Sequence, residues 1–146
     1  MKKILLMLTT LFLLVACQSE SDEGKKAPGG EIIADGKTYE LKFLNYEWTE
    51  DNLVIRQPNS ESIYESLQGD QAIPVKKGDE LLLQTEKNPD SVTVITYNED
   101  GKKDTSTISD SKIIIPSEED NYFYEIIAEW ENGNKVSYGF SVEYTD

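Results

Sequence analysis

The chain of 146 residues contains no histidine and only one cysteine, Cys17. The absence of histidine excludes a Ser/His/acid catalytic triad and the usual zinc sites. A single cysteine forms no disulfide within the chain, so the folded part must be stabilised by its core. No glycine-rich, phosphate-binding loop is present. We therefore expect a protein that is not an enzyme and needs neither a cofactor nor a metal.

Basic residues are also scarce. Fourteen lysines and arginines stand against 28 acidic residues, which gives a net charge of −14, and Arg56 is the only arginine. Such a chain repels nucleic acid and anionic lipid surfaces. We expect no nucleic-acid partner and no attachment to a membrane through a basic patch. The simplest role of this charge is solubility.

No hydrophobic run is long enough to cross a bilayer. The run Ile4–Ala16 has thirteen residues and no charge, and it follows Met1, Lys2 and Lys3. A positive start, a short apolar stretch and a small residue at its end predict a secretory signal peptide over residues 1–16.

The end of this stretch makes the prediction more specific. Leu14, Val15, Ala16 and Cys17 resemble the lipobox of bacterial lipoproteins. The resemblance implies cleavage between Ala16 and Cys17 and lipidation of Cys17. The protein would then be anchored to the cell membrane on its extracytoplasmic face, which is periplasmic if the host has an outer membrane. Residues 1–16 hold two lysines and no acid, so the remaining chain would carry a net charge of −16.

The next residues are polar or small. In 18–30 only Ala27 is apolar apart from glycine and proline, so we interpret 17–30 as the lipidated cysteine followed by a flexible tether. Residues 31–146 have the length of one domain. They show about eight short strand patterns bounded by turn residues, at 31–34, 37–44, 53–56, 80–85, 91–97, 112–115, 122–130 and 136–144. A turn or two of helix is expected at 60–67. This pattern predicts an all-β antiparallel sandwich or barrel.

The last two patterns show the clearest alternation. Large apolar residues occupy every second position from Tyr122 to Trp130 and from Val136 to Tyr144. They share one face of a hairpin only if the loop has an odd number of residues. We therefore expect Asn132–Asn134 to form a three-residue loop with Asn134 left-handed, which sets Ile126 opposite Phe140. A bulge within either strand is the alternative.

The approach to this hairpin, Glu118 to Tyr124, resembles the segment before strand F in immunoglobulin-like domains. There an acidic residue precedes a corner tyrosine by four positions, and the residue two after that tyrosine points inward. Tyr124 stands where antibody domains have cysteine. The resemblance implies an immunoglobulin-like antiparallel β-sandwich of about seven to eight strands. The segment Ile73–Leu81 and the final Tyr-Tyr-Ile-Ala-Trp pattern are also similar to uncharacterised exported proteins of Bacillus-type bacteria.

Two constellations are candidate sites. Oxygen-rich residues gather at 98–104 and 118–120, as they do in calcium-binding loops, but without the regular acid spacing of an EF-hand. Turn chemistry explains the first group better, and the approach to the last hairpin explains the second. The second constellation is a candidate binding surface, comprising Tyr46, Trp48, Phe123 and Ile127. These side chains either rim a binding surface or pack under a second layer made by residues 45–75.

These patterns indicate a lipid-anchored lipoprotein that displays a non-enzymatic binding or envelope-interaction module. The expected partners are the membrane, through Cys17, and a protein or envelope polymer. Two alternatives stay open, a carboxylate-based envelope hydrolase and an accessory or inhibitory subunit of another envelope protein. Two close acids in a pocket would favour the hydrolase, and an unpaired sheet edge with apolar neighbours would favour the subunit.

Overall fold

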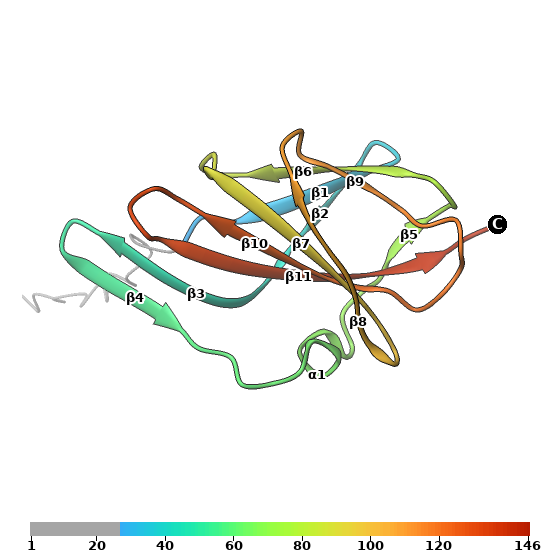
Figure 1. Cartoon of the computed structure of the whole chain (residues 1–146), viewed down its shortest axis with the longest axis horizontal. Coiled ribbons are helices and arrows are strands. Elements are labelled where there is room, and N and C mark those ends of the chain that lie inside the picture. The colour runs from blue at the N-terminus through green and yellow to red at the C-terminus, as the bar shows by residue number, and fades with distance from the viewer. Residues whose placement is uncertain (1–26) are drawn as a thin grey trace, which may run out of the picture.

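The computed structural model describes residues 27–146, apart from the side chains of Lys102 and Lys103. The described chain is a β-sandwich made of a four-stranded and a seven-stranded sheet, as expected from the strand patterns (Figure 1). Its elements are β1 (Gly30–Ala34), β2 (Lys37–Glu40), β3 (Lys42–Glu50), β4 (Leu53–Gln57), α1 (Ile63–Leu67), β5 (Ile73–Val75), β6 (Glu80–Thr85), β7 (Ser91–Asn98), β8 (Gly101–Ile108), β9 (Lys112–Ile114), β10 (Phe123–Glu129) and β11 (Lys135–Tyr144).

The strand order is that of an immunoglobulin-like sandwich. The smaller sheet runs β2-β1-β6-β9, and the larger runs β4-β3-β11-β10-β7-β8, with β5 added parallel to β11. The series β11-β10-β7-β8 corresponds to strands G, F, C and C′, and the neighbours β6 and β9 correspond to B and E. The pairs β1–β2 and β3–β4 extend one sheet each.

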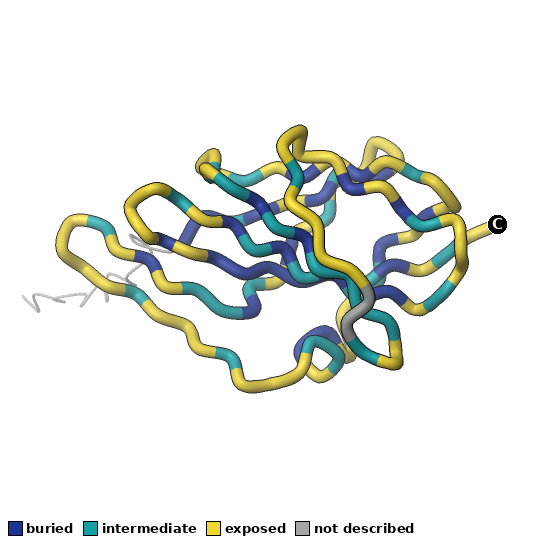
Figure 2. Tube along the Cα trace, viewed as in Figure 1, coloured by how far each residue is buried: buried dark blue, intermediate teal, exposed yellow. Residues whose placement is uncertain are grey.

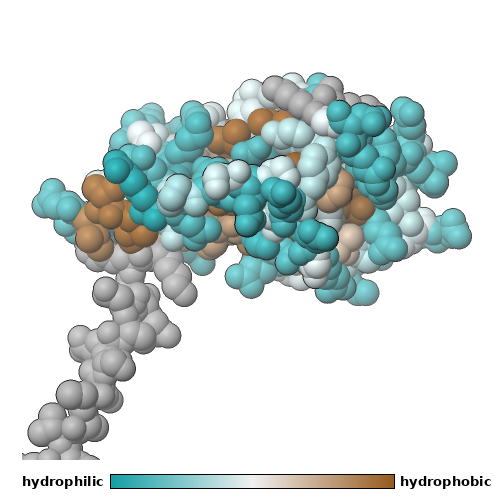
Figure 3. Space-filling view, turned by 90° about the horizontal axis from the view of Figure 1, so that it is seen from below, coloured by the Kyte–Doolittle hydropathy of each residue, from teal (hydrophilic) through white to brown (hydrophobic). Residues whose placement is uncertain are grey.

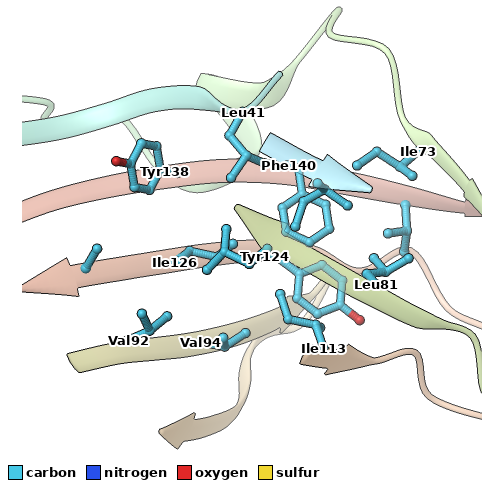
Figure 4. Packing of buried hydrophobic residues seen from close by; sticks show 14 of the residues in the cluster. Leu41, Ile73, Leu81, Val92, Val94, Ile113, Tyr124, Ile126, Tyr138 and Phe140 are labelled. Carbon is cyan, nitrogen blue, oxygen red and sulfur yellow. The ribbon is translucent and has the colours of Figure 1, made fainter. Parts of the chain in front are cut away.

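The corner before β10 has the hydrogen bond typical of such domains. The Tyr122 hydroxyl donates to the Glu118 carbonyl oxygen at 3.0 Å. Tyr124, two residues later, is 1% exposed and stacks on Phe140 with ring centroids 4.7 Å apart. Tyr124 thus points inward where antibody domains have a cysteine, but its stack joins neighbouring strands of one sheet, β10 and β11, whereas the antibody disulfide joins strands B and F across the two sheets (Figure 4).

The core lies between the two sheets. Apolar side chains from both inner faces are buried there, among them Ile32, Leu81, Val94, Ile126 and Tyr138. Figure 2 shows this burial concentrated in the central strands, while β4 at one margin is largely exposed. The prediction that the alternating apolar residues of β10 and β11 share one buried face is confirmed, because the inward positions of both strands are buried.

The hairpin loop has the predicted odd length but a different register. Ile126 pairs with Tyr138, and Tyr124 pairs with Phe140, two residues away from the expected pairing of Ile126 with Phe140. The loop is 131–133, closed by the Trp130 N–H donating to the Asn134 carbonyl oxygen at 3.0 Å. Gly133, with φ +84°, takes the left-handed position that we assigned to Asn134. Glycine adopts that conformation without a Cβ penalty, which decides the register.

The described residues form three more strands than the sequence patterns predicted, and they also form the predicted helix. Residues 27–146 contain eleven strands where the patterns predicted about eight, because β5 and β8 were not expected and the predicted strand 37–44 is divided at Leu41. Strand β8 has a polar sequence, Gly-Lys-Lys-Asp-Thr-Ser-Thr-Ile, and forms by pairing with β7 at the edge of the sheet. The expected helix exists as α1, begun by a capping box between Ser62 and Glu65.

The folded domain begins before residue 31, and residues 27–30 are not part of a tether. Ala27 is 2% exposed, and the Pro28 carbonyl oxygen accepts a hydrogen bond from Tyr138 at 2.5 Å. Gly30 opens β1, where a Cβ would lie 3.2 Å from Leu41 Cδ1. Small residues let this segment pack closely on the core, although composition alone made it resemble a linker.

Candidate binding surface

The structure divides the four candidate residues between two faces of the larger sheet. Tyr46 and Trp48, on β3, face the sandwich interior, and Trp48 is 3% exposed. Its ring meets Trp130 edge to face at 4.9 Å. Phe123 and Ile127 lie on the outer side of β10 and are half-buried. The four residues therefore do not form one surface, and the buried Trp48 presents no side chain to a partner.

A β-bulge explains why Tyr46 and Trp48 point inward. Ser137 of β11 pairs with Asn45, but the next residue, Tyr138, pairs with Phe43, so Leu44 is an extra residue on β3. Leu44 turns to the outer face, where Gly139 makes room for it: a Cβ on Gly139 would lie 2.9 Å from Leu44 Cδ1. The bulge keeps the aromatic residues on both sides of it against the core.

Between Phe123 and Ile127, Glu125 occupies the outer face of β10. Its two carboxylate oxygens accept hydrogen bonds from the Ser137 hydroxyl at 2.7 Å and from the Tyr97 hydroxyl at 3.0 Å. Ser137 is 0% exposed. Three neighbouring strands, β7, β10 and β11, thus hold one half-buried carboxylate in a fixed orientation.

This arrangement also sets the protonation of Tyr97. Burial, and then the negative charge and hydrogen bond of Glu125, raise the pKa of Tyr97 from 10.0 to about 12. Tyr97 therefore stays protonated and remains a hydrogen-bond donor to the carboxylate throughout the neutral range.

The segment after β4 covers this carboxylate and forms a pocket with it. Tyr64 of α1 packs edge to face on Phe123, with ring centroids 4.8 Å apart, and its hydroxyl donates to the Asn98 carbonyl oxygen. The pocket between this segment and the sheet has a volume of about 360 Å³. Its lining consists of Leu44, Asn45, Asn59, Glu61, Ser62, Ile63, Tyr64, Ser66, Tyr97, Gly101 and Glu125. We call it the outer-face pocket.

The lining of the outer-face pocket combines two carboxylates, amides, hydroxyls and two tyrosine rings. Amides and carboxylates hydrogen-bond hydroxyl and amine groups, and tyrosine rings give apolar contact area with a polar tip. The pocket volume lies at the small end of the range for ligand sites, which is about 300 to 1,000 Å³. The arrangement suits a small polar unit, such as one residue of a longer chain.

The two acidic loops approach one another at the far end of the sandwich. The Asn121 side-chain amide donates to Glu99 Oε1 at 2.6 Å, which joins the loop after β7 to the loop before β10. Within the part of the chain that the structure describes, no group of three or more histidine, cysteine, aspartate or glutamate residues is arranged to hold a metal ion.

The predicted lipidation site Cys17, with Ala16 at the cleavage point, lies outside the described residues. From Ala27 to the C-terminus, no helix has the length and apolar character needed to cross a membrane. Neither a protein-family model nor a curated protein matches the chain significantly.

Sequence reasoning missed the residues at the centre of the pocket. Glu125 and Ser137 could have been found as polar residues between apolar neighbours on the outer parity of the last two strands. Tyr97 was assigned to a strand, but the separation of 28 residues between it and Glu125 gave no sign that they meet. The contribution of Tyr64 depends on where α1 docks, which a short helix does not encode locally.

Proposed function

We propose that this protein is a lipid-anchored lipoprotein on the extracytoplasmic face of the cell membrane that displays a non-enzymatic binding module. The lipobox at Leu14–Cys17 supports the anchor. The outer-face pocket supports the binding function, through one observation: Glu125 is held by two hydroxyls under an aromatic and amide-rich wall. Its partner is an envelope polymer, bound through one of its polar repeating units.

The anchor is tested by Cys17→Ser. The substituted precursor has no thiol to alkylate, so it should take up no label when cells are fed a fatty-acid analogue. Fatty-acid label on the Cys17→Ser protein would refute the lipoprotein proposal. This outcome is independent of what the folded domain binds.

Binding is tested by co-sedimentation of the purified protein with insoluble envelope polymer. Tyr64→Ala removes one wall of the outer-face pocket, and Glu61→Gln changes an exposed lining charge. Glu31→Gln is the matched control, because Glu31 is an exposed acid on β1 in the other sheet. We expect both pocket variants to bind at least fivefold more weakly and the control to bind normally. Equal binding by all three would refute the assignment of this pocket.

Two carboxylates, of Glu61 and Glu125, line the pocket, and this is the observation that favours the alternative of a hydrolase. The same co-sedimentation experiment separates the two functions. A hydrolase releases soluble fragments from the polymer, and Glu125→Gln abolishes their release. A binding module retains the polymer intact.

The edge of the larger sheet favours the other alternative, an accessory subunit. Strand β4 is an edge strand with Leu53 and Val54 about half exposed. Figure 3 shows hydrophobic surface at the end of the molecule where the β3–β4 hairpin lies. An exposed apolar edge is suited to strand addition by a partner protein. Val54→Lys would abolish that contact and leave binding to the polymer unchanged.

A further inference from the structure

A second pocket lies inside the sandwich, on the opposite side of the larger sheet from the outer-face pocket. It opens where β8, the last strand of one sheet, and β9, the last strand of the other, are not paired with each other. Its volume is about 310 Å³. Val94 and Ile113 line it as buried residues, whereas Asp104 and Ser106 are exposed and mark its mouth. We call it the inter-sheet pocket.

Tyr124 lines the inter-sheet pocket, and its buried hydroxyl has no hydrogen-bond partner among the described residues. The residue is 1% exposed, and its ring is fixed by the stack on Phe140. Figure 4 shows the hydroxyl ending beside Ile113, another lining residue. Burial raises the pKa of Tyr124, so the group is a neutral donor. A buried donor without an acceptor is unfavourable and rare in folded proteins.

The other tyrosines near this core show what is unusual about Tyr124. Tyr122 donates to the Glu118 carbonyl oxygen, Tyr138 to that of Pro28 and Tyr144 to that of Pro116. The fold thus supplies these three hydroxyls with backbone acceptors. One other buried donor, Trp130 Nε1, also has no partner in the described region, but Trp130 does not line this pocket.

Water is a poor occupant of this position. A buried water molecule normally makes two to four hydrogen bonds. The buried residues lining the inter-sheet pocket are Val94, Ile113, Tyr122 and Tyr124, and Tyr122 already donates its proton to Glu118. The polar lining residues Thr96, Asp104, Ser106 and Lys112 are half-buried or exposed. An apolar molecule with one acceptor atom matches the buried part of the lining better than water does, because it needs a single donor and covers the aliphatic walls.

We propose that the inter-sheet pocket binds a small, mostly apolar molecule that carries a carbonyl oxygen, with Tyr124 donating a hydrogen bond to that oxygen. The molecule enters between β8 and β9, past Asp104 and Ser106. This site is independent of the outer-face pocket and of the anchor, and it stands if either of those proposals fails.

The probe for this proposal is 2-heptanone, a short aliphatic ketone, titrated into the purified full-length protein carrying isotope-labelled tyrosine. The nuclear magnetic resonance signal of Tyr124, assigned from its loss in Tyr124→Phe, should shift saturably, and so should that of Tyr122, the other tyrosine in the lining. Tyr124→Phe keeps the ring and the cavity, and the Tyr122 signal should then report a dissociation constant about fivefold higher, since one neutral hydrogen bond is lost.

A second variant tests the position of the pocket. Ser106→Trp adds a large side chain at the exposed mouth on an edge strand, and should abolish binding without changing the core. The absence of a saturable shift in the unsubstituted protein would overturn the proposal, and so would an unchanged dissociation constant in both variants. A crystal soaked in the ketone that shows only water bonded to Tyr124 would also overturn it.

Discussion

Two buried tyrosines on neighbouring strands allow the same chemical change to be made in opposite hydrogen-bonding situations. Tyr138 on β11 and Tyr124 on β10 are 0% and 1% exposed. The Tyr138 hydroxyl donates to the Pro28 carbonyl oxygen at 2.5 Å, whereas the Tyr124 hydroxyl has no partner within the described residues. Replacing each by phenylalanine removes one oxygen atom and leaves the ring in place.

The expected magnitudes differ in size and can differ in sign. Tyr138→Phe leaves the buried Pro28 carbonyl without its donor, which costs about 1 to 3 kcal/mol. Tyr124→Phe removes a buried hydroxyl that has no partner, so the free energy of unfolding should stay the same or rise by up to about 1 kcal/mol. For a domain of this size, each kcal/mol corresponds to a shift of roughly 3 to 6 °C in the thermal midpoint.

Equilibrium unfolding in urea, followed by tryptophan fluorescence, measures both variants. The midpoint should fall for Tyr138→Phe, with an unchanged slope, and should not fall for Tyr124→Phe. Amide exchange gives a local check: the Glu86 N–H donates to the Gly29 carbonyl oxygen beside Pro28, and it should exchange faster only in Tyr138→Phe. If Tyr124→Phe were the more destabilising change, the reasoning from hydrogen-bond partners would be refuted.

Two other features of the larger sheet give further predictions. Gly139→Ala places a Cβ 2.9 Å from Leu44 Cδ1 and should cost about 1 to 3 kcal/mol, while Leu44→Ala in the same protein should relieve the clash; additive effects in a double-mutant cycle would contradict this. Burial, followed by the charge of Glu125, raises the folded-state pKa of Tyr97 to about 12, so the folded state holds this proton more tightly than the unfolded state. Its contribution to stability is complete below about pH 10 and is lost between about pH 10 and 12. When urea unfolding is measured across this pH range, the free energy of unfolding should fall less steeply with pH in Tyr97→Phe than in the unsubstituted protein. An equally steep fall in both proteins would show that Tyr97 contributes nothing.

Alternation in the sequence was sufficient to predict the sandwich and the inward faces of its last two strands. The faces follow from parity, and parity follows from the period of two along each strand. The register needed more information, because the choice between Gly133 and Asn134 for the left-handed position shifts every pair by two residues. Glycine tolerates that position better, which was the available signal.

The outer-face pocket could not be predicted in the same way. Its central contact joins Tyr97 to Glu125, and its wall joins Tyr64 to Phe123 across 59 positions of the sequence. Such contacts depend on how α1 docks on the sheet, and α1 has only five residues. Phe123 was identified as a surface candidate because of its parity, whereas Trp48 was lost from the set because the bulge at Leu44 reversed the face of β3.

The first strand also determines how the domain responds to mechanical load. The described chain enters at the end of the sandwich that carries the β3–β4 and β10–β11 turns, and β1 then runs lengthwise along the smaller sheet (Figure 1). Tension applied through the residues before Ala27 therefore acts along the axis of β1. The hydrogen bonds of β1 to β2 and β6 lie across that axis, so they are sheared together and do not open one after another. When the domain is pulled from its N-terminal side, the pairings of β1 with β2 and with β6 therefore resist the removal of β1 together.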